Sequence, residues 1–304
     1  MFVVNPDPFL VPSYRISPFT TEHTASNSEL PTNDFAVTYF NTKFGKGNWQ
    51  YTYNGREAIG LALETYQFAP TDLVTILTTS NNFYISSCVT KEIEKVCRWN
   101  REIVPETKII FVNHEFGYPF FEMDKLIATG LPIIEDCCTT FFSQDANGKI
   151  GLYGDFSVYS FPKFLPIQIG GLLIKNVSKV IKKSLLNREE ERYIENIVSY
   201  HLAIESELLQ KRKIIFDYAL EQFSNLGFTL RFKKNEKVVP SVLLLNNNGI
   251  MKDLNAFKQF IANNGVQSSI FYGEDAFFLP NHHNLTIKSI DYFIQLILFF
   301  INFE

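Results

Sequence analysis

One lysine stands alone among apolar residues in the stretch SFPKFLPIQIGG, which runs from Ser160 to Gly171. The neighbours of Lys163 are phenylalanine, proline and leucine, so we expect its side chain to be desolvated. Burial disfavours the charged ammonium form, and a neutral amine attacks carbonyl carbons, as Schiff-base lysines do. In the alternative interpretation, the lysine ends a strand with its stem on apolar surface and its ammonium group in water. The flanking residues alone favour this alternative.

Two other stretches place polar groups beyond the carboxyl ends of buried strands, where α/β proteins bind ligands. Asp136 closes the apolar run in LPIIEDCCTT, where it either serves a site or caps the next turn. Asn54 and Gly55 directly precede a helical pattern that contains Arg56. Free amides at a helix start attract phosphate. The same pattern also describes an ordinary N-cap followed by a surface arginine, and spacing alone favours the N-cap.

Short apolar runs alternate with helical patterns through the first part of the chain. The predicted strands are LVTIL, KIIFVN, LPIIED, FSVYSF and GGLLIK, and the predicted helices cover about 56–67, about 83–98 and the segment FEMDKLIATG, which ends at Gly130. Such alternation predicts an α/β fold, with a mostly parallel central sheet and helices on both faces. The first fifty residues are predicted to be irregular.

A long charged helical stretch follows Lys175 and precedes a short mixture of strands and helices. We therefore predict a large domain over residues 1–175, including the irregular N-terminal segment, and a helical linker with a small α+β domain over residues 176–304. The last apolar run, YFIQLILFFINF, is shorter than the ~20 residues that span a bilayer. It predicts a buried terminal helix, with a tail at the membrane surface as the alternative.

Composition narrows the class of partner. The net charge of -4 and the pI of about 5.8 disfavour nucleic acid as a partner and favour a small molecule. Four cysteines without a CxxC pair indicate reduced thiols, and the adjacent His282 and His283 lack a third metal ligand, so we predict no metal site. The proline-rich N-terminus is not typical of a secretory signal, so we expect a cytoplasmic protein without membrane association. His114 is interpreted as a structural histidine.

Several motifs in a fixed order resemble one known family. They are NGREAIGLAL, TTSNNFYISSCV, VNHEFGYPFF, LPIIEDCCTTFFSQDANGKIGLYGDFSVYSF and KFLPIQIGGLLI. Together they are similar to the DegT/DnrJ/EryC1/StrS aminotransferases, which are sugar aminotransferases of fold type I that depend on pyridoxal 5'-phosphate (PLP). The resemblance covers residues 51–174 well and the C-terminal part only loosely.

The resemblance implies one PLP site. Lys163 would be the Schiff-base lysine. Asp136 would face the pyridine nitrogen and keep the ring protonated, so that the ring acts as an electron sink. Phe83 would stack on the ring. The remaining cofactor-binding residues, several of them around the phosphate, would be Asn54, Gly55, Arg56, Thr139 and Ser160.

The chain departs from the family pattern in three places. The family usually has three residues between SF and the lysine, whereas here Pro162 alone intervenes, so Ser160 or Lys163 is expected to be displaced. Thr139 stands where relatives present Gln or His near a cofactor oxygen, and its hydroxyl could still donate one hydrogen bond. The segment after GGLLI, which in relatives reaches into the partner subunit's site, is nearly absent.

The resemblance implies a homodimeric, cytoplasmic aminotransferase. It would transfer nitrogen from an amino donor, which we expect to be glutamate, to a nucleotide-linked keto sugar in lipopolysaccharide or surface-polysaccharide biosynthesis. A degenerate relative that acts as a binding or assembly protein is the alternative. The short chain favours that alternative, whereas the retention of Lys163 with Asp136 disfavours it. A dehydratase that uses pyridoxamine phosphate is disfavoured because those relatives replace the lysine.

Overall fold

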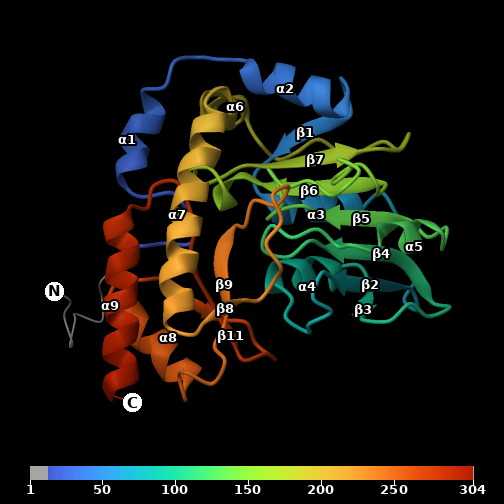
Figure 1. The fold of residues 1–304 in the computed structure, drawn as a ribbon. Coiled ribbons are helices and arrows are strands. Elements are labelled where there is room, and N and C mark those ends of the chain that lie inside the picture. The colour runs from blue at the N-terminus through green and yellow to red at the C-terminus, as the bar shows by residue number, and fades with distance from the viewer. Residues whose placement is uncertain (1–12, 304) are drawn as a thin grey trace.

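A seven-stranded sheet lies at the centre of the larger part of the molecule, with the strand order β1-β7-β6-β5-β4-β2-β3 (Figure 1). The computed structural model describes residues 13–303, so most of the proline-rich N-terminus lies outside the described residues. Strands β2 to β6 pair in parallel, whereas β7 and β1 are antiparallel to their neighbours. The predicted mostly parallel sheet is confirmed. The strands are β1 (Trp49–Thr52), β2 (Leu73–Thr78), β3 (Arg98–Asn100), β4 (Thr107–Asn113), β5 (Ile133–Asp136), β6 (Phe156–Ser160) and β7 (Gly171–Lys175).

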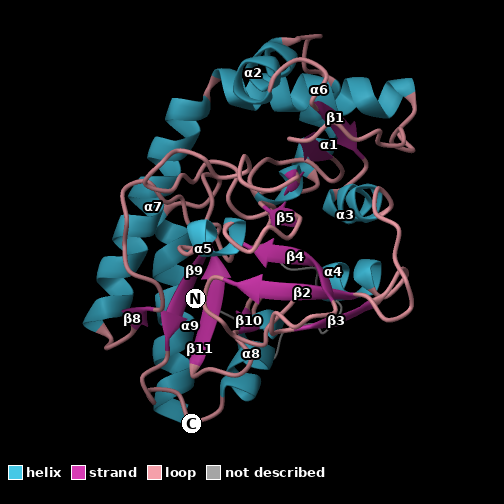
Figure 2. Cartoon of the chain, turned by 90° about the vertical axis from the view of Figure 1, so that its right-hand side faces the viewer, coloured by secondary structure: helices cyan, strands magenta, loops and turns pink. Residues whose placement is uncertain are grey.

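Helices cover both faces of this sheet because successive strand residues point to opposite sides. Phe111 and Ile134 pack on the face that carries α3 (Gly55–Leu63) and α4 (Ser87–Ile93). Ile110 and Ile133 pack on the opposite face, under α5 (Met123–Ile127). Farther along that opposite face lie α2 (Phe35–Phe44) and α6 (Arg188–Ala203), which pack together at the top of the view in Figure 2.

A second, antiparallel sheet has the strand order β10-β11-β9-β8. Its apolar face packs against helices α7 (Glu205–Asn225), α8 (Leu254–Asn263) and α9 (Ile287–Phe303), as seen at the left and bottom of Figure 1. Helix α9 buries Ile290, Phe293 and Leu296 in this core, which confirms the predicted buried terminal helix. Among residues 13–303, no helix has the length and apolar character needed to cross a bilayer. The strands are β8 (Thr229–Leu230), β9 (Val242–Asn246), β10 (Ser269–Ile270) and β11 (Ala276–Pro280).

Two predictions about local structure were wrong. The first fifty residues were expected to be irregular, but their described part, residues 13–50, contains α1 (Glu22–Ser28) and α2. Phe40 and Phe44 lie four residues apart on α2, so both enter the core beneath it. The helix predicted over 83–98 is reduced to α4, because a loop precedes Ser87 and the chain turns into β3 at Arg98.

A buried basic cluster joins α6, α7 and the segment after β11. The Arg212 guanidinium is 1% exposed, lies 4.7 Å from the centre of the Phe164 ring and donates to the carbonyl of Asn281. Burial lowers the pKa of His201 to about 4. Burial, and then the charge of Arg212, lower the pKa of His282 to about 3. In the folded protein these imidazoles therefore stay neutral at pH values well below the ordinary pKa of histidine.

This cluster predicts a loss of stability in mild acid. Below pH ~6.5 the unfolded chain takes up protons that His201 and His282 reject in the folded state, so the free energy of unfolding falls as pH falls. Urea unfolding at pH 7.5 and 5.0 should show a loss of roughly 1–2 kcal/mol for each histidine. The buried carboxyl of Asp136, whose pKa burial raises, acts in the opposite direction. The test therefore compares the pH dependence of the free energy of unfolding between wild type and His282→Gln, and this dependence should be smaller in the variant. An equal dependence in the two proteins would contradict the prediction.

Candidate active site

A cleft of about 800 Å³ opens where the carboxyl ends of β4, β5 and β6 face the second sheet. Parallel strands end at the same edge of a sheet, and ligands bind there. Asp136 and Lys163 line this one cleft. Five of the other predicted site residues line it with them: Asn54, Gly55, Arg56, Thr139 and Ser160. Pro162, which lies between the serine and the lysine, lines it as well.

The shortened spacing between Ser160 and Lys163 is bridged by a single 3₁₀ turn. Ser160 ends β6 and precedes the turn Phe161–Lys163, in which Pro162 is the second residue. Side chains three residues apart eclipse one another in a 3₁₀ helix, so both residues face the cleft. The expected displacement of one of them out of the site is therefore not observed.

Lys163 is not desolvated as predicted. Its side chain is exposed to the cleft, while the flanking Phe161, Phe164 and Leu165 turn into the core. The apolar neighbours thus anchor the turn and leave the amine free. Among residues 13–303, Lys163 has no hydrogen bond or ion pair. The amine can therefore reach a ligand without first breaking another contact.

The start of α3 forms the end of the cleft next to Ser160. Asn54 is the N-cap, and its side chain accepts the amide hydrogen of Glu57 at 2.9 Å. A helix leaves its first amides without acceptors, so those of Gly55 and Arg56 remain available. A Cβ atom on Gly55 would lie 2.8 Å from the Cys138 sulfur and 3.3 Å from the Ser160 Cβ. Glycine at position 55 therefore allows this helix start to lie against Ser160.

Asp136 is 6% exposed at the end of β5. The amide of Cys138 donates to its Oδ1 atom at 3.0 Å and holds the carboxyl in place. Burial raises its pKa, an effect that the Cys138 hydrogen bonds and the charges of His114 and Lys163 only partly offset. A cationic group bound in the cleft would favour the ionised carboxylate.

Two predicted contacts are already partly used within the chain. The Thr139 hydroxyl donates to the carbonyl of His114 at 2.8 Å, and its oxygen accepts the amide of Gly117 at 3.3 Å. Its one hydrogen is therefore committed, contrary to the expected donor role. The Arg56 guanidinium is exposed and donates to the Cys88 sulfur at 2.9 Å. Burial alone would raise the pKa of Cys88, but Arg56 and Ser86 lower it overall.

Phe83 does not reach the cleft. Its ring is 84% exposed, and the Arg101 guanidinium lies 5.7 Å from the ring centre. The next residue, Tyr84, lines the cleft instead and stacks on the Phe116 ring with a centroid distance of 6.3 Å. The chain approaches the cleft through a loop before α4, so the spacing of the motif did not fix which of the two adjacent aromatic rings points inward.

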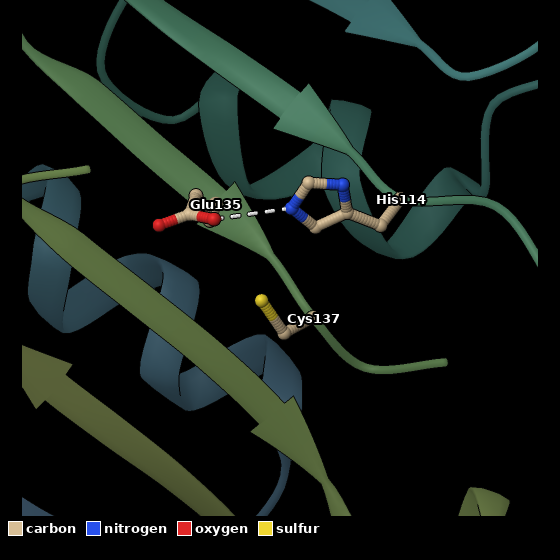
Figure 3. Close-up of side chains that lie close together, drawn as sticks. All are labelled: His114, Glu135 and Cys137. Atoms are coloured by element: carbon tan, nitrogen blue, oxygen red, sulfur yellow. Dashed lines mark hydrogen bonds and ion pairs between the residues drawn. The ribbon is translucent and has the colours of Figure 1, made fainter. Parts of the chain in front are cut away.

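His114, Glu135 and Cys137 cluster together, as Figure 3 shows, and none of them lines the cleft. Their potential ligand atoms lie within 4.8 Å of one another, and all three residues are buried. However, His114 Nδ1 accepts the amide hydrogen of Phe120 at 2.9 Å, so Nε2 carries the proton that it donates to Glu135 at 3.2 Å. Glu135 also accepts three backbone amides, from Gly151, Tyr153 and Gly154. These hydrogen bonds use the lone pairs that a metal would need and support a structural role for His114.

Several cleft residues were missed by the sequence reasoning. Asn113 ends the apolar run KIIFVN and Glu115 lies two residues beyond it, so the strand-end rule that selected Asp136 could have selected them as well. The opposite wall comes from the second sheet and from α8, and no local signal marks it. Its polar residues are Ser241, Lys258, Gln267, Ser268 and Ser269.

Known structures share this fold over nearly the whole chain. The aminotransferase TlmJ from Streptoalloteichus hindustanus is 16% identical, with 98% of both chains covered and a TM-score of 0.70. A sugar aminotransferase from Micromonospora echinospora is 15% identical, with 95% of this chain and 99% of that chain covered and a TM-score of 0.66. NtdA from Bacillus subtilis, solved with pyridoxamine phosphate, is 17% identical, with 93% and 83% covered and a TM-score of 0.65. No curated protein sequence matches the chain.

The cleft and the fold define a PLP-dependent transferase of fold type I. The sequence profile of the DegT/DnrJ/EryC1/StrS aminotransferase family matches residues 38–189, and the chain belongs to that family. The predicted family, enzyme class and cofactor are thereby confirmed. The family profile ends near the start of α6, so it describes the large sheet and its helices.

The residues of the cleft fit PLP chemically. A buried carboxyl at Asp136 suits a protonated pyridine nitrogen. The α3 amides beside Ser160, where no Cβ intrudes, suit a phosphate. The exposed amine of Lys163 suits an aldehyde. All three groups line one cleft, as is required if they are to contact the nitrogen, the phosphate and the aldehyde of a single cofactor.

Proposed function

We propose that this protein transfers an amino group to a nucleotide-linked keto sugar in lipopolysaccharide or surface-polysaccharide biosynthesis, with Lys163 and Asp136 as its catalytic residues. The observation that carries the proposal is that an exposed amine and a buried carboxyl face the same cleft beside a helix start. Similar folds include sugar aminotransferases, which supports a sugar as the acceptor. Glutamate as donor, a homodimeric assembly and a cytoplasmic location belong to the same proposal.

Each residue has one task in this mechanism. PLP, when bound, supplies an electron sink for the charge that develops on the substrate carbon. Asp136 holds a proton on the pyridine nitrogen through its negative charge. Lys163 Nζ would hold the cofactor and, when free, would take a proton from the substrate carbon, so one group would serve as nucleophile and base. The amides of Gly55 and Arg56, together with the Ser160 hydroxyl, fix the phosphate and thereby the ring.

The connection between β7 and α6 makes hydrogen bonds to the large sheet and to α3 of the same chain. Gln50 donates to the carbonyl of Lys182 at 2.9 Å, and the Ser184 hydroxyl donates to Glu57 at 3.0 Å. Because these hydrogen bonds hold the segment against β1 and α3, we expect it to be too short to extend to a substrate in a partner subunit, as the loop of relatives would. This observation favours the second candidate, a non-catalytic binding protein, and the experiment below separates the two.

The test uses the full chain with PLP, L-glutamate and a panel of nucleoside-diphosphate keto hexoses. We expect the visible absorbance of bound PLP to be lost on addition of L-glutamate and to return on addition of one member of the panel. Retention of PLP without any response to an amino donor would support the binding protein. A response to L-glutamate that pyruvate reverses but no keto sugar does would refute the sugar assignment alone.

A further inference from the structure

The Thr139 hydroxyl already donates its hydrogen within the protein, so it cannot donate to the ring hydroxyl oxygen of the proposed PLP cofactor. Thr139 has one hydrogen, and it is directed to the carbonyl of His114, which can only accept. Relatives are expected to place a side-chain donor at this position near a cofactor oxygen. In this chain the donor must come from another cleft residue, or the oxygen has none.

Asn113 is the residue in position to supply it. It ends β4 and pairs in register with Asp136 on β5, and both residues line the cleft. Registered residues on neighbouring parallel strands direct their side chains to the same face of the sheet. Asn113 is half-buried, and its amide group makes no hydrogen bond within residues 13–303. A free side-chain amide therefore lies next to the carboxyl that is proposed to hold the pyridine nitrogen.

The strand order decides which side of the ring Asn113 faces. Ser160 and the α3 amides lie on the β6 side of Asp136, whereas Asn113 lies on the β4 side. In PLP the phosphate arm and the ring hydroxyl flank the aldehyde carbon on opposite sides of the axis through the nitrogen. If the nitrogen lies at Asp136 and the phosphate toward β6, the hydroxyl oxygen would point toward β4.

We propose that the side-chain amide of Asn113 donates a hydrogen bond to the ring hydroxyl oxygen of PLP, in place of Thr139. The inference rests on the proposed function, because it assumes that PLP is bound with its nitrogen at Asp136 and its phosphate at α3. Asn113 is then a positioning residue that keeps the ring in its plane and tunes its charge. The amide suits this task because it donates and carries no charge of its own.

The first test is a pH titration of the visible absorbance of bound PLP in wild type, Asn113→Ala and Thr139→Val. A hydrogen-bond donor stabilises the ionised ring hydroxyl oxygen and draws electron density away from the neighbouring cofactor group that is attached to Lys163. Loss of this donor should therefore raise the midpoint of the absorbance titration by about one pH unit. Loss of one hydrogen bond to a charged acceptor should also weaken PLP binding roughly tenfold. Thr139→Val should move neither quantity, and Asn302→Ala on the exposed end of α9 is the matched control.

Three outcomes separate the possibilities. A raised midpoint in Asn113→Ala alone supports the inference. An unchanged midpoint and affinity in Asn113→Ala, or a shift in Thr139→Val alone, overturns it while leaving the proposed function intact; failure of wild type to bind PLP overturns both. Should Asn113→Ala fold poorly, Asn113→Asp replaces the donor with an acceptor of the same size, and its midpoint should rise further.

Discussion

Replacing Lys163 with alanine should abolish covalent attachment of PLP and lower transamination by at least about 10⁴-fold, because one amine acts as nucleophile and base. Borohydride reduction of wild type loaded with PLP should add a pyridoxyl group to the peptide that contains Lys163, as read by mass spectrometry. The same treatment of Lys163→Ala should label no cleft peptide. Stability should be unaffected, since the side chain is exposed and unpaired within the described chain.

A second lysine in the cleft provides the control. Lys258 also lines the cleft, but its ammonium group donates to the Tyr272 hydroxyl at 3.1 Å and lies 5.5 Å from the centre of that ring. Lys258→Ala should therefore keep the pyridoxyl label at position 163. Labelling of Lys258 in the wild type, or undiminished activity in Lys163→Ala, would show that the catalytic amine has been misassigned.

Replacing Asp136 with asparagine should leave the fold and PLP attachment in place but slow the reaction with L-glutamate by about 10²–10³-fold, the usual cost of losing a preorganised charge. Asparagine keeps an oxygen for the Cys138 amide but cannot hold a proton on the pyridine nitrogen. Stopped-flow absorbance measures this rate directly. Because burial disfavours the charge on Asp136, the apoprotein of the variant should be at least as stable as wild type.

The neighbouring acid on the same strand distinguishes a chemical role from a structural one. Glu135 is fully buried, does not line the cleft and accepts three backbone amides and His114. Glu135→Gln loses acceptor capacity, so it should destabilise the fold by roughly 2 kcal/mol or more in urea unfolding. If Asp136→Asn is the destabilised variant and reacts at the wild-type rate, the proposed role of Asp136 is wrong.

Much of the candidate cofactor site was predictable, in the sense that most of the proposed residues line one cleft, because its signals are local. Asp136 ends an apolar strand, and Asn54 and Gly55 precede a helical pattern. Parallel strands must present their carboxyl ends at one edge, so these positions meet whatever the details of packing. The family resemblance added the chemical roles of Lys163 and Ser160. The spacing between those two differed from relatives, and a 3₁₀ turn accommodates the difference.

Other features depended on contacts between distant parts of the chain. The exposure of Lys163 could not be read from its neighbours, since their apolar side chains turn inward only when β6 and β7 pair and α2 and α6 cover them. The choice of Tyr84 over Phe83 is made by a loop, where side chains do not alternate as they do in a strand. The commitment of Thr139 requires the carbonyl of His114 on another strand.

The sequence by itself determined five of the seven strands of the large sheet, the sheet edge at which polar residues gather and the residue types offered there, because periodicity and chain order act over short distances. Only the tertiary structure decided which of those groups are already hydrogen-bonded and which remain free. It also supplied the wall formed by Ser241 and Lys258. Hydrogen bonds and burial depend on residues far apart in the chain, and their pairing exists only after folding.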